Sequence, residues 1–111
     1  MCGRYVRKTG ALEIAHAFSA VVSGSSLPLN YNISPTTDVY VLRTDSETLK
    51  IDVMSWGLIP TWAKDASRAA SLINARSESV TEKPSFRNLL SRHRCVMPMN
   101  AYYEWKPMKI S

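Results

Sequence analysis

Residues 38–55 read DVYVLRTDSETLKIDVMS, and this stretch decides the fold class. Apolar side chains alternate with polar ones through its second part, at Leu49, Ile51 and Val53. Such alternation is typical of a strand with one buried face. The β-prone run 38–43 precedes the polar segment 44–47, which is typical of a turn. We therefore predict a β-hairpin with strands at 38–43 and 48–55.

The helices that the sequence predicts are short. Residues 11–18 present one apolar face, which predicts a helix with Thr9 as its N-cap. A second helix is predicted at 85–93, with Phe86 and its neighbouring leucines facing inward. Residues 63–71 fit a short helix or an ordered loop.

Further strands are predicted at 2–6, 94–97 and 101–106, and residues 23–36 are predicted to form a loop rich in serine, proline and asparagine. Together these elements predict an α+β fold with a mixed, mostly antiparallel sheet and short flanking helices. The chain ends soon after the last strand, so we expect an incomplete fold.

Composition narrows the class of protein. The chain has 111 residues, of which 45% are apolar and 21% charged, as in one small globular domain. It contains no membrane-length apolar run and no signal-peptide pattern. We expect a cytoplasmic, intracellular protein in which Cys2 and Cys95 are free thiols, Cys95 being buried. His16 and His93 stand alone, so no metal and no organic cofactor is expected.

The net charge of +5 suits a partner that carries phosphate groups. Eight of the fourteen cations are arginines, and arginine binds phosphate through two parallel hydrogen bonds. Nucleic acid is therefore a candidate partner, although many basic proteins bind none.

Cysteine at position 2 has chemistry that other positions lack. Once Met1 is removed, Cys2 carries an α-amine and a thiol on adjacent carbons, and both have a nucleophilic fraction near neutral pH. The amine can attack an aldehyde to give an imine, which the thiol can close into a five-membered thiazolidine. A retained Met1 would turn this amine into an amide and block the reaction.

Four short motifs occur in order along the chain. They are Cys2-Gly3-Arg4-Tyr5, Trp56-Gly57-Leu58-Ile59-Pro60 with Trp62, Ile73-Asn74-Ala75-Arg76 with Glu78, and Tyr103-Glu104-Trp105-Lys106. With the segment Asn32-Ile33-Ser34-Pro35, they resemble the SOS-response-associated peptidase (SRAP) family from Met1 to about Pro107. The resemblance implies a barrel-like mixed sheet, of which residues 1–111 would be the N-terminal portion of a single domain.

The resemblance also implies a function. SRAP proteins trap the ring-opened aldehyde of an abasic site in single-stranded DNA as a thiazolidine crosslink. Cys2 matches the reactive residue, Asn74 the asparagine that holds sugar and N-terminus, and Glu104 the glutamate that transfers protons. Matches to the DNA-contacting positions are Arg4, Arg76, Trp62 and Pro35.

Residue chemistry alone leaves some of these roles open. Glu104 suits proton transfer if Tyr103 and Trp105 partly bury it, but strand alternation could equally point it outward. Asn74 could be a turn residue. Among the tryptophans, which are more often core residues than stacking platforms, we expect Trp62 to be the most exposed.

Two other functions remain open. Class II glutamine amidotransferases also begin Met-Cys-Gly, but their Arg-Gly-Pro-Asp-like and Asn-Gly segments are missing here. A non-covalent module that binds single-stranded DNA is the other alternative. Peptidase activity would be limited to self-removal of a leader, and only Met1 precedes Cys2.

SRAP domains are longer than this chain, and a histidine of theirs lies in a second half that has no counterpart here. Neither histidine of this chain matches that position. We expect the exposed sheet edges to be completed by that second half or by a second copy in a dimer.

Overall fold

The computed structural model describes residues 2–108 and contains two three-stranded sheets, in the orders β3-β1-β6 and β2-β5-β4. In chain order the elements are β1 (Tyr5–Arg7), α1 (Ala11–Phe18), β2 (Val21–Val22), β3 (Asn30–Ile33), β4 (Asp38–Asp45), β5 (Thr48–Ser55), a 3₁₀ turn η1 (Ala69–Ser71) and β6 (Ala101–Tyr102). All pairings are antiparallel except that of β2 with β5. The predicted mixed, mostly antiparallel α+β fold is confirmed.

The β4–β5 hairpin follows the sequence pattern closely. Its strands pair from Asp38–Ser55 to Asp45–Thr48, so the predicted four-residue turn shortens to two residues. Ser46 and Glu47 have φ angles of 47° and 71°. Positive φ at both central positions is the backbone of a tight hairpin turn that matches strand twist.

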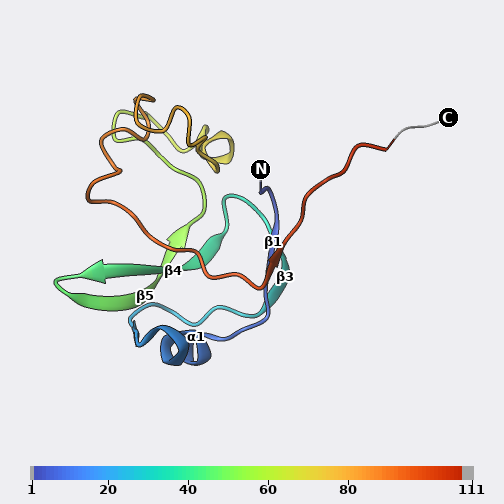
Figure 1. The fold of residues 1–111 in the computed structure, drawn as a ribbon, viewed down its shortest axis with the longest axis vertical. Coiled ribbons are helices and arrows are strands. Elements are labelled where there is room, and N and C mark those ends of the chain that lie inside the picture. Colours follow the sequence, from blue (N-terminus) through green and yellow to red (C-terminus); the bar gives the residue numbers. More distant parts are fainter. Residues whose placement is uncertain (1, 109–111) are drawn as a thin grey trace.

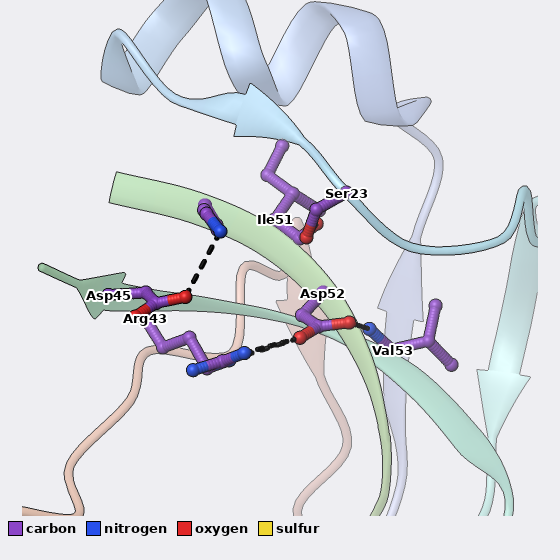
Figure 2. Close-up of polar contacts among 7 residues, drawn as sticks. Ser23, Arg43, Asp45, Ile51, Asp52 and Val53 are labelled. Carbon is purple, nitrogen blue, oxygen red and sulfur yellow. Dashed lines mark hydrogen bonds and ion pairs between the residues drawn. The ribbon is translucent and has the colours of Figure 1, made fainter. Parts of the chain in front are cut away.

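Polar side chains tie the hairpin strands together on one face, as Figure 2 shows. Arg43 donates to the Asp52 carboxylate at 3.0 Å, and Lys50 donates to that of Asp45 at 3.0 Å. The backbone N–H of Val53 also donates to Asp52, at 2.9 Å. The hydrogen bond from Lys50 lowers the pKa of Asp45, and the Val53 N–H, followed by Arg43, lowers the pKa of Asp52.

Strand β4 lies between two apolar clusters. Its Val39 and Val41 pack with Tyr5, Ile33 and Trp56 in the first. The second cluster takes the alternate β4 side chains, and its buried members are Ile14, Tyr40, Leu42 and Ile51. Because successive strand residues point to opposite faces, one strand can supply both clusters.

The smaller sheet brings both ends of the described chain together. Tyr5 of β1 pairs with Ile33 of β3 on one side and with Tyr102 of β6 on the other. Figure 1 shows α1 on one side of the strands and the turn-rich segment after β5 on the other, with the N-terminus beside the last part of the chain. This arrangement lets residues near Cys2 meet residues from beyond position 100.

The second half of the chain is less regular than predicted. The helix expected at 85–93 is wrong: this segment is a series of turns, with bonds such as Arg87 N–H to the Lys83 carbonyl. Short helices need an apolar face to pack against. Here Phe86, Leu89 and Leu90 line an open cavity together with Leu58 and Val80 instead of packing into a closed core.

Three strand boundaries also need correction. The first strand starts at Tyr5 rather than Cys2, and the last is confined to Ala101–Tyr102. The strand expected at 94–97 is reduced to one bridge between Val96 and Leu42 on the free edge of β4. No longer partner strand lies there among residues 2–108 to extend it.

The structure also revises the predictions for the loop at 23–36, for the start of α1 and for the 63–71 segment. The predicted loop 23–36 contains β3, whose four residues pair with the distant β1. Thr9 is not the N-cap of α1, because Gly10 holds that position and the Thr9 hydroxyl accepts a bond from Asn100. Of the 63–71 segment, only η1 is helical.

The sheets stay open in the described part of the chain, where no closed barrel forms. The predicted ending after a strand concerns residues 109–111, which lie outside the described residues.

Candidate functional site around Cys2

Asn74 binds the residue that carries the predicted chemistry. Its side-chain Nδ2 donates a hydrogen bond of 2.8 Å to the Cys2 carbonyl oxygen, across 72 positions of sequence. The Cys2 Sγ makes a long contact of 3.6 Å with the Arg4 carbonyl. Cys2 itself is half-buried and packs against the first apolar cluster. Two of the three predicted catalytic residues are thus in contact.

Trp56 and Gly57 explain how Asn74 reaches Cys2. Buried Trp56 donates its indole N–H to the Ile73 carbonyl at 3.3 Å, and the Leu58 N–H bonds the Leu72 carbonyl at 3.0 Å. Gly57 has a φ of 132° and lies so close to Ala69 that an added Cβ would be 2.6 Å from its carbonyl oxygen. Only glycine fits this approach without strain.

An open groove of about 680 Å³ lies beside Cys2, and its lining residues are Gly3, Arg4, Asn32, Tyr103 and Trp105. Arg4 donates to the Asn32 side-chain oxygen at 3.2 Å. The hydroxyl of Tyr103 donates to the Tyr31 carbonyl at 2.9 Å, which ties the two walls together. A guanidinium beside exposed aromatic faces is the usual composition of a site for a single nucleic-acid strand.

Asn32 and Tyr103 were not among the predicted site residues, although both lie in segments of the motifs. Only the pairing of β1 with β3 and β6 brings them to Arg4. The motifs contained both residues, but the sequence could not show that they lie next to Arg4 in the fold.

The remaining predicted DNA-contacting residues do not line this groove. Trp62 lies in a separate hollow with Lys64 and Arg68. Pro35 is half-buried in the turn after β3, and Arg76 is exposed at the start of the turn-rich segment. Whether nucleic acid joins these positions stays a prediction.

The three tryptophans differ in exposure from what we expected. Trp62 is exposed, as predicted, with 62% of its surface accessible, but Trp105 is more exposed at 86%. The ranking that put Trp62 first is therefore wrong. Trp56 is buried and packs edge-on against Tyr5, with ring centroids 5.4 Å apart.

The structure decides two questions of burial. Of the two alternatives for Glu104 the exposed one holds, because the last strand ends at Tyr102. Cys95 is exposed rather than buried, since Val96 makes only a single bridge to β4. Partial desolvation of its sulfur still raises the pKa of the Cys95 thiol.

Tyr5 lies beneath this site and is fully buried. Burial raises the pKa of its hydroxyl to about 12; a negative charge on Cys2 would add to the rise, and the Arg7 cation opposes it. Arg7 is buried too, bonded to the Thr9 and Pro28 carbonyls at 2.8 and 2.6 Å and placed 4.4 Å from the Tyr40 ring centroid.

Residues 2–108 contain no cluster of three or more histidine, cysteine or acidic side chains that could hold a metal ion. Within the same residues, no helix has the length and apolar character needed to cross a bilayer.

Fold and site together define a mixed α+β domain with a half-buried cysteine beside a basic, aromatic groove. The model of the family described as SOS response associated peptidase (SRAP) matches residues 1–111. The chain belongs to the SRAP family.

Relatives in three organisms support this membership. The abasic site processing protein YoaM of Bacillus subtilis is 37% identical over 109 residues, which cover 96% of this chain and 48% of that protein. A Saccharomyces cerevisiae relative, the abasic site processing protein YMR114C, is 37% identical over 87 residues, or 77% of this chain and 23% of its own. The abasic site processing protein HMCES of Rattus norvegicus is 34% identical over 89 residues, covering 69% of this chain and 25% of that protein.

A crystal structure of a Bordetella bronchiseptica protein has the same fold, with a TM-score of 0.72 and 23% identity. The match covers 93% of this chain and 50% of that one. This chain likewise spans about half the length of the Bacillus relative, which agrees with a partial fold.

Proposed function

We propose that this protein captures abasic sites in single-stranded DNA covalently, through the amine and thiol of Cys2. The observation that carries this proposal is the 2.8 Å hydrogen bond from Asn74 to the Cys2 carbonyl. It fixes the backbone of a residue that would otherwise be a free chain end. A fixed nucleophile has already lost much of the entropy that the reaction requires.

The reaction would proceed through an imine. The Cys2 α-amine adds to the aldehyde carbon of the ring-opened sugar, and a C–N bond forms. The resulting carbinolamine oxygen takes up a proton and leaves as water. The sulfur then adds to the imine carbon, and the thiol proton passes to the ring nitrogen. The product is a thiazolidine, and one water is released overall.

Removal of Met1 is a condition of this chemistry, and Met1 lies outside the described residues. Glu104 is the residue to which we assign the proton transfers. It is exposed and stands in sequence between Tyr103 and Trp105, which line the groove, so it would act in contact with solvent rather than from a buried pocket.

The groove suits a single strand. Arg4 would bind a backbone phosphate, and the 86% exposed Trp105 offers a face on which a base can stack. We assign Arg76, Trp62 and Pro35 to the same strand beyond the groove. The protein would then act inside the cell, at the nucleoid.

The length of the match suggests how the chain is organised. We propose that residues 1–111 are the N-terminal portion of a single SRAP-like domain, since the aligned part is 48% of the YoaM protein. A second half or a second copy would then complete the open sheets.

An abasic oligonucleotide tests the proposal. Protein without Met1 is incubated with a single strand that holds one abasic site, and the product is analysed by denaturing electrophoresis and mass spectrometry. We expect an adduct that survives denaturation and carries the mass of protein plus DNA minus one water.

Cys2→Ala should abolish the adduct, whereas Cys95→Ala, at an exposed thiol away from the groove, should leave it unchanged. Equal adduct yields from Cys2→Ala and the parent would overturn the assignment. Release of ammonia from glutamine would instead favour an amidohydrolase. Binding without any preference for abasic strands would favour a non-covalent module.

A further inference from the structure

Tyr5 has a buried hydroxyl without a hydrogen-bond partner among residues 2–108. The side chain is 0% exposed and is surrounded by Ile33, Val39, Val41 and Trp56. A phenol buried in this way normally finds an acceptor, because an unpaired polar group in an apolar cluster is unfavourable. Phenylalanine would fill the same space without that penalty. The unpaired Tyr5 hydroxyl therefore needs a functional explanation.

Cys2 is the polar neighbour that could use it. The residue packs on the same cluster, and a charge on its sulfur acts directly on the Tyr5 hydroxyl. The present contact of the sulfur, 3.6 Å from the Arg4 carbonyl, suits a thiol that donates its proton. A thiolate has no proton to donate and would be repelled by that carbonyl oxygen, so it needs a different partner.

We propose that Tyr5 is a positioning residue that donates a hydrogen bond to the Cys2 sulfur once the thiol has lost its proton. The inference rests on the proposed function, in which this sulfur closes the thiazolidine ring. The bond requires the Cys2 side chain to rotate to another staggered position, away from the Arg4 carbonyl.

The protonation state of Tyr5 fits this role. With a pKa of about 12, the hydroxyl keeps its proton throughout the pH range in which a thiol ionises. The charged groups that act on it are Arg7 in β1 and Cys2 itself. Tyr5 can therefore donate a hydrogen bond but does not compete with Cys2 as an acid.

Tyr5→Phe and alkylation by iodoacetamide test the proposal without any DNA. A hydrogen bond to a thiolate raises the thiolate fraction but lowers the intrinsic reactivity of the sulfur, and the two effects only partly cancel. Loss of the hydroxyl should therefore slow alkylation of Cys2 at pH 7 and speed it at pH 10, by roughly threefold in each case. Mass spectrometry of the Cys2 peptide gives the rates, with Cys95 in the same molecule as the internal standard.

Tyr102→Phe is the matched control, because Tyr102 is exposed and pairs with Tyr5 in the sheet. It should leave the Cys2 rate unchanged at both pH values. The melting temperature of Tyr5→Phe should equal or exceed that of the parent, since no fold contact is lost.

Three results would overturn the proposal. One is a Cys2 rate in Tyr5→Phe that matches the parent at both pH values. Another is a Cys2 alkylation rate in Tyr5→Phe that falls at both pH values or rises at both, which would indicate a change in access to the sulfur. The third is a lower melting temperature, which would mean that the hydroxyl is bonded within the fold. Failure of the parent protein to react with abasic DNA would overturn the proposed function and leave these rates unaffected.

Discussion

At the scale of single residues, the contact between Asn74 and Cys2 links the motif that begins the chain to one in its second half. The donor is a neutral amide and the acceptor a backbone carbonyl, so the bond leaves the thiol and the amine of Cys2 free to react. Asn74 is half-buried, which limits competition from water. In the proposed reaction it would hold the backbone of the nucleophile.

Asn74→Ala should slow adduct formation on abasic DNA by about 3- to 10-fold, because one neutral hydrogen bond contributes about 0.5–1.5 kcal/mol. Single-turnover rates from denaturing gels measure this effect. Asn88→Ala, at an exposed position in the turn-rich segment, is the control and should react like the parent. An unchanged rate in Asn74→Ala would mean that Cys2 is held by other contacts.

The sequence could indicate which residues are candidates for the site, but it could not indicate how exposed their side chains are. Cys2 and Asn74 could be named from their side chains and motifs, and the structure brings them together. The exposure of Glu104 and Cys95 depends on where β6 ends and on how little of the chain near Val96 pairs with β4. Neither the end of β6 nor the short pairing near Val96 can be predicted from the local sequence pattern.

At the scale of elements, those that depend on neighbouring sequence were predictable, and those that depend on distant partners were not. The β4–β5 hairpin was predictable because its strands are adjacent in sequence and alternate in polarity. Strand β3 was not, because its four residues are mostly polar and form a strand only through pairing with β1. The turns at 85–93 carry a helical apolar pattern, but the apolar side chains line an open cavity rather than a closed core that would hold a helix.

Gly57 connects β5 to the segment that carries Asn74. We predict that Gly57→Ala lowers the free energy of unfolding by about 2–4 kcal/mol, through backbone strain and the clash with Ala69. Urea denaturation followed by tryptophan fluorescence measures it. Gly10→Ala, where an added Cβ meets nothing within 4 Å, should cost less than about 1 kcal/mol. Similar losses at the two positions would contradict the assignment of strain to Gly57.

The hairpin ion pairs predict a pH dependence of stability. The Val53 N–H and then the Arg43 side chain hold the pKa of Asp52 below 3.8. A carboxyl with a depressed pKa stabilises the fold at pH values above its unfolded pKa, and this contribution is lost as the pH falls through the folded value. Asp52→Asn should therefore lower the melting temperature slightly at pH 7, because exposed pairs contribute little.

The difference between Asp52→Asn and the parent should shrink as the pH drops below 3.8, when the parent carboxyl is protonated as well. Thermal melts recorded from pH 7 to pH 2 check this. Arg43→Gln should remove part of the same pH-dependent difference. A gap between Asp52→Asn and the parent that stays constant down to pH 2 would show that the effect is not electrostatic.

At the scale of the whole molecule, the net charge of +5 is shared among several surfaces. Arg4 lies in the groove beside Cys2, whereas Arg43, Arg92 and Arg94 line a separate hollow near Cys95. A single strand could be attracted by the total charge or held by the groove alone. These two modes of binding differ in how individual arginines affect the salt dependence of the affinity.

Arg4→Gln and Arg92→Gln in a Cys2→Ala background separate the two modes, because a protein without the Cys2 thiol should not form the crosslink that would mask non-covalent binding. Each phosphate contact on a single strand contributes about 0.7 to the slope of log affinity against log salt. If the groove holds the strand, Arg4→Gln should reduce the slope by about 0.7 and Arg92→Gln should leave it unchanged. Fluorescence anisotropy of a labelled oligonucleotide between 50 and 300 mM salt measures both. Equal effects of the two substitutions would mean that the strand follows overall charge, and that the groove beside Cys2 selects its substrate only in the covalent step.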